Sequence, residues 1–346
     1  MNNHATLSAR QPRHRAVILL ATLALLNILA WGLAALAFSH SATLMGSAIL
    51  AYSFGLRHAV DADHIAAIDN ITRKLMQQGK PACSVGAWFS LGHSTIVVLA
   101  SLMIAGATIT FRAQLVELHA LGGTIGTAVS ALFLTIVALI NLTILMAIWR
   151  KFRLLKQGNS LPDEALDALS GGWLSRLCRP LFRLITHSWQ MYLVGFLFGL
   201  GFDTATEIGL LGLSAAGAGQ GMNVGTIMIF PALFAAGMVL IDTLDNLIMV
   251  GAYGWAFSRP VRKLYYNMTI TGASVIVALF IGGIEALGLI TETLHLNGKP
   301  WHTIVRLNDN LGDMGFWIIG LFALCWLVSF INYRLCGYDK LSVNQP

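Results

Sequence analysis

Charged residues are scarce in this sequence. Asp, Glu, Lys and Arg make up 11% of its 346 residues, about half of the fraction in an average soluble domain. That scarcity excludes an ordinary water-soluble fold. Cysteine is also rare, and no two cysteines form a C-x-x-C pair, so neither a zinc site nor a disulfide framework is indicated. The cysteines are Cys83, Cys178, Cys325 and Cys336.

Two motifs of catalytic proteins are missing as well. The sequence has no Walker-type phosphate loop, and it has no H-E-x-x-H motif of the kind found in metalloproteases. We therefore expect no ATPase activity in this chain and no enzymatic function.

Long apolar runs dominate the sequence instead. Apolar residues make up 56% of the chain and the mean hydropathy is +0.70. We expect an all-α, polytopic membrane protein with a single transmembrane domain over residues 1–346. The first run, 16–38, is too long for the core of a signal peptide and is interpreted as a retained helix. About eight transmembrane helices are expected, at 16–38, 43–70, 84–109, 121–149, 190–217, 226–257, 267–290 and 313–334.

The distribution of basic residues predicts the orientation. Of the 22 Lys and Arg residues, only Arg112, Lys299 and Arg306 fall in connections on one side, and Arg57 lies inside a helix. All others fall on the opposite side, which the positive-inside rule places in the cytoplasm together with both termini. The net charge of +6 is thereby explained without a nucleic-acid partner.

The longest predicted connection, 150–189, is cytoplasmic and joins the two halves of the chain. Its basic amphipathic part fits two roles equally well, contact with membrane lipid or a plain tether. The connection before the last helix, around Trp301 and His302, is expected to be an interfacial loop.

The second predicted helix carries a cluster of ionisable residues at membrane depth, where charge is costly. His58, Asp61 and His64 lie within about 120° of one another on a regular helix, so they share a face. Asp63 points elsewhere unless the helix breaks, and a break would bring all four together. Imidazole and carboxylate ligands suit a first-row divalent metal ion. Farther along this helix, Asp69, Arg73 and Lys74 are expected to form a solvated helix end.

The third predicted helix adds Ser90 and His93, which are three residues apart and share a face. His93 is a candidate ligand, although a histidine beside Ser94 and Thr95 also suits an ordinary interhelical hydrogen bond.

Carboxylates also recur inside the fifth and sixth predicted helices. Asp203 and Glu207 have i, i+4 spacing, and Asp242 and Asp245 have i, i+3 spacing. Like charges this close repel each other unless a cation or a proton is shared. Arg57 can neutralise one carboxylate but not all of them.

Four sequence motifs, in this order along the chain, resemble those of the nickel/cobalt transporter family. They are Arg57-His58-Ala59-Val60-Asp61-Ala62-Asp63-His64-Ile65, Phe89-Ser90-Leu91-Gly92-His93-Ser94, Leu200-Gly201-Phe202-Asp203-Thr204-Ala205-Thr206-Glu207, and the run from Gly237 to Asp245. The resemblance covers most of the chain and is closest to bacterial nickel permeases. It implies eight helices, a bacterial inner-membrane location, high-affinity uptake into the cytoplasm to supply nickel enzymes, and a requirement for His58, Asp63 and His64. Without the resemblance, the ligand types leave zinc, iron and manganese open.

We therefore expect a secondary transporter that imports Ni²⁺, and also Co²⁺, with no cofactor and no ATPase partner. The expected metal ligands are His58, Asp61, Asp63, His64 and His93. The expected pathway residues are Arg57, Ser90, Asp203, Thr204, Glu207, Asp242 and Asp245. Two alternatives are an exporter of the same fold, which His-rich cytoplasmic loops would favour, and an intramembrane metalloenzyme, which lacks a recognisable catalytic motif here.

Overall fold

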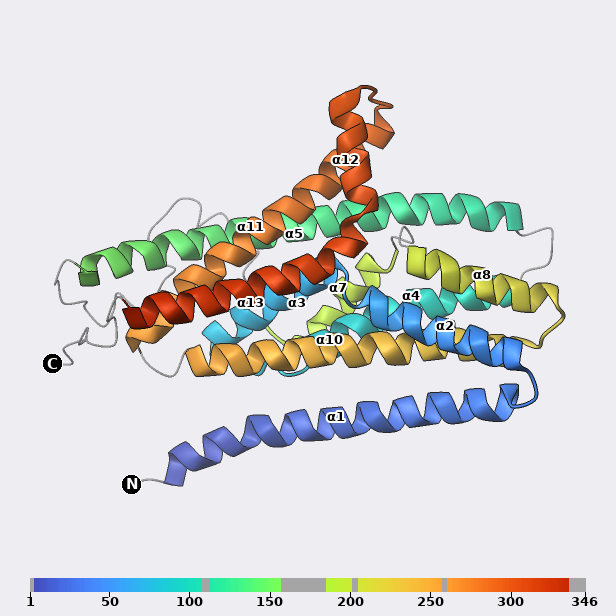
Figure 1. Cartoon of the computed structure of the whole chain (residues 1–346), viewed down its shortest axis with the longest axis horizontal. Helices are drawn as coiled ribbons and strands as arrows, with labels where there is room; N and C mark the ends of the chain where they lie inside the picture. Colours follow the sequence, from blue (N-terminus) through green and yellow to red (C-terminus); the bar gives the residue numbers. More distant parts are fainter. Residues whose placement is uncertain (1–2, 107–111, 157–184, 201–204, 257–259, 336–346) are drawn as a thin grey trace.

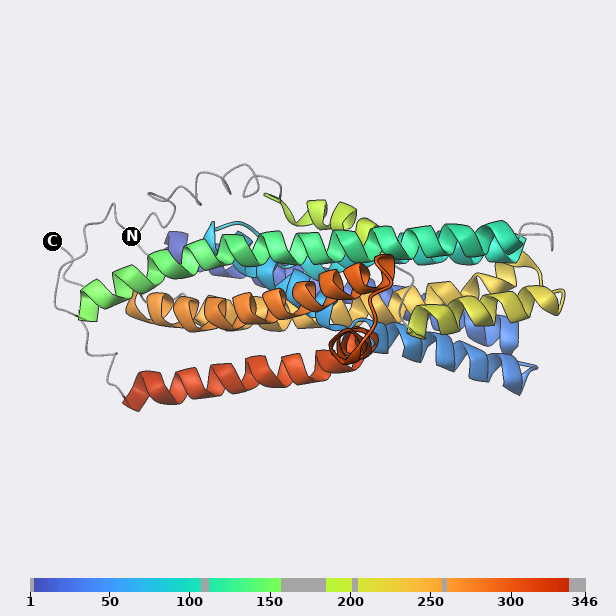
Figure 2. The ribbon, with the colours of Figure 1, turned by 90° about the horizontal axis from the view of Figure 1, so that it is seen from above.

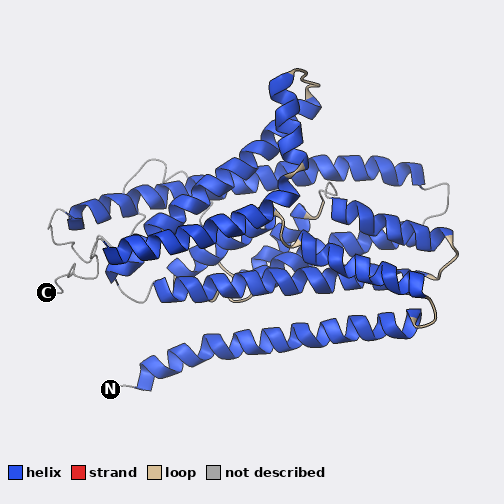
Figure 3. Ribbon diagram, viewed as in Figure 1, coloured by secondary structure: helices blue, strands red, loops and turns tan. Residues whose placement is uncertain are grey.

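The computed structural model describes residues 3–106, 112–156, 185–200, 205–256 and 260–335. Within these ranges the regular structure is entirely helical (Figure 3), which confirms the all-α prediction. The α-helices are α1 (Asn3–Phe38), α2 (Ala42–His58), α3 (Ala62–Gln77), α4 (Val85–Gly106), α5 (Arg112–Lys156), α7 (Met191–Phe198), α8 (Ala205–Gly219), α9 (Val224–Ile227), α10 (Ile229–Ala256), α11 (Pro260–Thr293), α12 (Lys299–Asp309) and α13 (Leu311–Leu335). A short 3₁₀ turn, η3 (Ser188–Gln190), precedes α7.

Six stretches in the described part of the chain are long and apolar enough to cross a membrane. They are His14–Phe38, Val85–Gly106, Thr124–Arg150, Val224–Gly254, Met268–Thr293 and Met314–Leu335. Large apolar side chains such as Leu36 and Trp317 stay more than four-fifths exposed on these helices. A surface of this kind is compatible with lipid and not with water, so the chain is a multi-pass membrane protein.

The predicted helix at 43–70 is wrong as a single helix, because the chain breaks between α2 and α3. The break consists of Ala59, Val60 and Asp61. Asp61 takes an extended backbone conformation (φ −76°, ψ 150°), and its side chain accepts a hydrogen bond from the backbone N–H of Ala62 at 2.7 Å. Aspartate is a favoured N-cap residue, so the sequence starts a new helix here. α2 and α3 run end to end through the molecule (Figure 1).

The start of α13 closes over this break. A Cβ atom on Gly315 would overlap the backbone carbonyl of Val60. Only glycine therefore lets α13 lie against the main chain between the two half-helices.

The predicted helix at 190–217 is also divided. α7 ends at Phe198 and is followed by Gly199, and α8 begins at Ala205. The predicted site residues Asp203 and Thr204 lie between these helices, outside the described residues.

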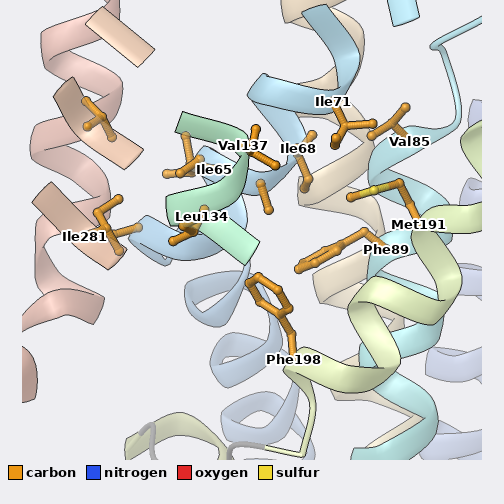
Figure 4. Packing of buried hydrophobic residues seen from close by; sticks show 14 of the residues in the cluster. Ile65, Ile68, Ile71, Val85, Phe89, Leu134, Val137, Met191, Phe198 and Ile281 are labelled. Carbon is orange, nitrogen blue, oxygen red and sulfur yellow. The ribbon is translucent and has the colours of Figure 1, made fainter. Parts of the chain in front are cut away.

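α3 lies at the centre of the apolar core. Its Ile65, Ile68 and Ile71 pack against α4, α5, α7 and α11 (Figure 4). The prediction that Asp69, Arg73 and Lys74 form a solvated helix end is wrong, because all three side chains are buried. Neighbouring helices also cover the polar C-terminal half of α3, which keeps these side chains from water.

The start of α1 and the end of α13 lie at the same end of the molecule (Figures 1 and 2). We call this end the N/C end; α5 also ends there, and α11 begins there. The prediction of an interfacial loop around Trp301 and His302 is wrong, because this connection forms the helix α12. Pro300 in its first turn suits a helix start. Most of the predicted connection at 150–189 lies outside the described residues.

We predict that Gly315→Ala destabilises the protein by about 1–3 kcal/mol, the usual cost of overpacking, because the added methyl group meets main chain that cannot rotate away. The measurement is the thermal unfolding midpoint in detergent. Gly320→Ala on the same helix is the matched control, since a Cβ there has nothing within 4 Å. Equal midpoints for the two variants would contradict the close contact.

Candidate metal centre

Three buried histidines from three helices meet beside the break. His58 is the last residue of α2, His64 lies in the first turn of α3, and His93 lies on α4. Their exposed fractions are 2%, 0% and 3%. One ring nitrogen from each lies within 4.8 Å of the other two. The break produces this meeting, because it places the end of α2 and the start of α3 at one point.

His58 and His93 face each other directly. Their Nε2 atoms are 2.9 Å apart, and His93 Nε2 is also 2.9 Å from a carboxylate oxygen of Glu207 on α8. Two imidazole lone pairs cannot face each other at this distance without a shared proton or cation. The Nδ1 atom of His58 lies 3.2 Å from the hydroxyl of Thr206. α8 therefore supplies both a negative charge and a hydroxyl to this pair.

His64 is held by a carboxylate on one side and has no hydrogen-bond partner on the other. Its Nδ1 atom lies 3.1 Å from Asp242 Oδ2 on α10, and the hydroxyl of Ser90 donates to the same oxygen. Its Nε2 atom is buried without a hydrogen-bond partner among the described residues. Such a group costs about 1–3 kcal/mol. A carboxylate on one ring nitrogen and a vacant second nitrogen is the usual arrangement of a metal-ligating histidine.

The helix α4 approaches α10 closely at this carboxylate. A Cβ atom on Gly86 would overlap the main-chain carbonyl of Asp242. The two backbones are therefore in contact at the residue that orients His64.

The predicted ligands Asp61 and Asp63 lie at the N-terminus of α3, outside the three-histidine cluster. Asp61 caps the helix, and Asp63 Oδ1 lies 2.8 Å from the backbone N–H of His64 and accepts its hydrogen bond. Asp63 remains half-buried. Both carboxylates therefore contribute to the start of the helix that carries His64.

Most of the predicted pathway residues in the described chain reach the cluster. Ser90, Glu207 and Asp242 contact the histidines or their carboxylate partners. Asp245 does not: it is half-buried, and its Oδ2 atom has no hydrogen-bond partner among the described residues. Arg57, one residue before His58, is also half-buried.

Sequence reasoning did not place Thr206 in the site. Its only signal was its position between Asp203 and Glu207 in the same motif. The residue is fully buried beside His58, and its hydroxyl fixes the orientation of that ring.

A second buried polar network, not predicted from the sequence, lies farther along α3. Asp69 accepts hydrogen bonds from Tyr253 on α10 and from Ser274 on α11, the latter at 2.6 Å. Arg73 lies 3.9 Å from the same carboxylate and donates to Asn70 at 2.8 Å. Asn141 on α5 also donates to Asn70, at 2.5 Å. These contacts tie α3 to three other helices.

The chemistry of the centre suits a divalent transition-metal ion. Three imidazoles provide nitrogen ligands of the type preferred by nickel, cobalt, zinc and copper. The carboxylates of Glu207 and Asp242 add negative charge in contact with the rings. An arriving dication would relieve both the facing imidazoles and the unpartnered nitrogen of His64.

A bundle of apolar helices, interrupted beside a buried polar centre, is the architecture of a helical membrane transporter. Comparison with known proteins identifies the family. Residues 44–332 match the NicO family, described as "High-affinity nickel-transport protein", and the chain belongs to this family. No solved structure gives a significant match.

Curated relatives resemble the chain over most of its length. The High-affinity nickel transport protein of Cupriavidus necator is 53% identical over 338 residues, 97% of this chain and 96% of the relative. The High-affinity nickel-transport protein NixA of Helicobacter pylori is 44% identical over 326 residues, 92% of this chain and 97% of the relative. The Cobalt transport protein NhlF of Rhodococcus rhodochrous is 37% identical over 296 residues, 84% of each chain. These names give no support to export or to catalysis.

We predict that Arg73→Met lowers the free energy of unfolding by about 3–5 kcal/mol, because it leaves the Asp69 carboxylate buried without its cationic partner. Equilibrium unfolding in mixed detergent micelles measures the loss. Arg153→Met, at an exposed position of α5, is the control. Adding Asp69→Asn to Arg73→Met should cost less than the sum of the single changes; strict additivity would argue against the ion pair.

Proposed function

We propose that this protein imports Ni²⁺, and also Co²⁺, across the bacterial inner membrane as a secondary transporter that supplies nickel enzymes. The observation that carries the proposal is the buried cluster of His58, His64 and His93 with its two carboxylate partners. Family membership and the names of the relatives support it.

The proposed topology has eight membrane crossings with both termini in the cytoplasm. Six crossings are the long apolar stretches, and the other two are pairs of half-helices, α2 with α3 and α7 with α8. Support comes from the basic residues, which gather at the connections of one side. The start of α1 and the end of α13 lie together at the N/C end (Figure 1), as an even number of crossings requires.

Helix ends inside the membrane favour an ion site at the α2–α3 break. The C-terminal end of α2, at His58, carries the partial negative charge of the helix dipole and attracts a cation. The N-terminal end of α3 carries the opposite partial charge. Asp61 caps that end and Asp63 lies in its first turn, so both carboxylates offset the positive charge. This is the role we assign to these two carboxylates, together with transient contact to the passing ion.

His58, His64 and His93 are the proposed ligands of the bound ion. Glu207 and Asp242 orient two of the rings and balance the charge, with Ser90 and Thr206 fixing the hydrogen bonds. The remaining pathway residues of the proposal, Arg57, Asp203, Thr204 and Asp245, rest on the sequence pattern.

The membrane potential can drive this uptake. A dication entering a negative interior gains about 4.6 kcal/mol per 100 mV, twice the value for one charge. Release into the cytoplasm requires the ligands to dissociate from the ion. Protonation of an imidazole promotes this step, because it removes the lone pair that binds the metal.

Uptake of labelled nickel into cells tests the proposal. We expect His64→Ala to abolish accumulation at submicromolar nickel, because it removes the nitrogen that Asp242 orients toward the ion. His302→Ala, at an exposed position on α12, should transport like the wild type. Competition of unlabelled cobalt with labelled nickel ranks the two metals as substrates. Collapse of the membrane potential should lower nickel uptake. Normal transport by His64→Ala at equal membrane abundance would refute the assigned site.

Asp242→Asn should weaken nickel binding by about 10–100-fold, the usual effect of losing the group that orients a histidine ligand. The measurement is a nickel titration of the purified protein. Asp309→Asn, at an exposed position at the end of α12, controls for loss of one negative charge. If both variants bind nickel equally well, Asp242 does not act through His64.

A further inference from the structure

A groove of about 740 Å³ opens between α5, α11 and α13, well away from the histidines. Its walls belong to three helices whose apolar stretches can each cross a membrane. Gly272 on α11 contributes to its depth: a Cβ there would meet only Leu145 within 4 Å, at 3.9 Å. The groove therefore faces the hydrocarbon and can hold a chain-like apolar molecule.

The lining of the groove changes from apolar to polar along its length. Leu145, Ile276 and Cys325 line the part farther from the N/C end. Arg150, Tyr265 and Asn332 line the part nearer to it, where the Asn332 amide donates to the Tyr265 hydroxyl at 3.0 Å. α11 runs opposite to α5 and α13 (Figures 1 and 2), yet each helix brings its polar residue to the same end. This gradient matches a molecule with an apolar tail and a polar head.

Positive charge surrounds the polar end. Arg150 and Arg153 on α5 and Arg334 on α13 are exposed there. The Arg334 guanidinium lies 4.7 Å from the centre of the Phe330 ring, which leaves it close to the helix surface. Segments 145–156, 260–276 and 325–335 contain no Asp or Glu. The head group that fits this end is therefore an anion.

We propose that this groove binds an anionic glycerophospholipid. The acyl chains lie along the apolar part, and the phosphate lies between Arg150 and the Asn332–Tyr265 pair. Arg150 lies at the end of its apolar stretch, where a basic side chain reaches the head-group level. With the N/C end in the cytoplasm, the lipid comes from the inner leaflet. The site does not depend on which metal the protein carries.

The test is lipid binding by the full-length protein in detergent, measured by native mass spectrometry. The probes are phosphatidylglycerol and phosphatidylcholine with identical acyl chains. We expect phosphatidylglycerol to bind more tightly. Arg150→Gln should weaken it about fivefold, which corresponds to about 1 kcal/mol per basic residue near a head group. Gly272→Leu, which fills the groove, should weaken both lipids.

Matched variants keep the test decisive. Arg306→Gln removes an exposed arginine on α12, and Gly320→Leu enlarges a glycine on α13 that has open space around it. Both should bind lipid like the wild type. Equal binding of the two lipids to the wild type would overturn the anionic preference. Unchanged binding by Gly272→Leu, or cross-linking of residues 157–184 or of a second copy into the groove, would overturn the lipid as its occupant.

Discussion

A helix that stops inside a membrane leaves backbone N–H and C=O groups without partners, and each such group costs several kcal/mol in hydrocarbon. The break between α2 and α3 meets this constraint with a few local contacts. Asp61 accepts the hydrogen bond of Ala62, and the backbone N–H groups of Val60 and Asp61 donate to the carbonyl groups of Arg57 and His58. Because the break is satisfied in this way, His58 and His64 can come from two helix ends and still share one centre with His93.

Burial of charge is the second constraint, and three of the buried carboxylates meet it by lying near a basic side chain. Asp242 faces His64, Glu207 faces His93, and Asp69 lies near Arg73. Each carboxylate thereby has a partner that can carry positive charge. The centre and the network on α3 differ in one respect. Arg73 is a permanent cation, whereas an imidazole is neutral or protonated according to its surroundings. Only the histidine centre leaves a place for a further positive charge.

Hydropathy predicted six of the membrane stretches because each is one continuous apolar run. It failed at 43–70 and 190–217, where the chain is divided by features that a window of averaged hydropathy does not record: an N-cap at Asp61 and a helix end at Gly199. Period-based reasoning placed Asp61 and His64 on one face of a regular helix. The break changed that geometry, bringing the histidines together and assigning Asp61 to the cap. The error at Asp69 has another cause. Its partners, Tyr253 and Ser274, are distant in sequence and reside in apolar helices, so nothing near Asp69 reveals that it is enclosed.

The contact between Gly86 and the main chain of Asp242 has a consequence for ion size. Side chains can rotate to widen a cavity, but two polypeptide backbones already touching have no such freedom. The separation of α4, which carries His93, from α10, which carries the carboxylate behind His64, is therefore set by hard-sphere contact. The distance between these two helices therefore has a fixed minimum at the metal centre. At the proposed metal site, α4 and α10 therefore cannot move closer together to contract around a smaller cation.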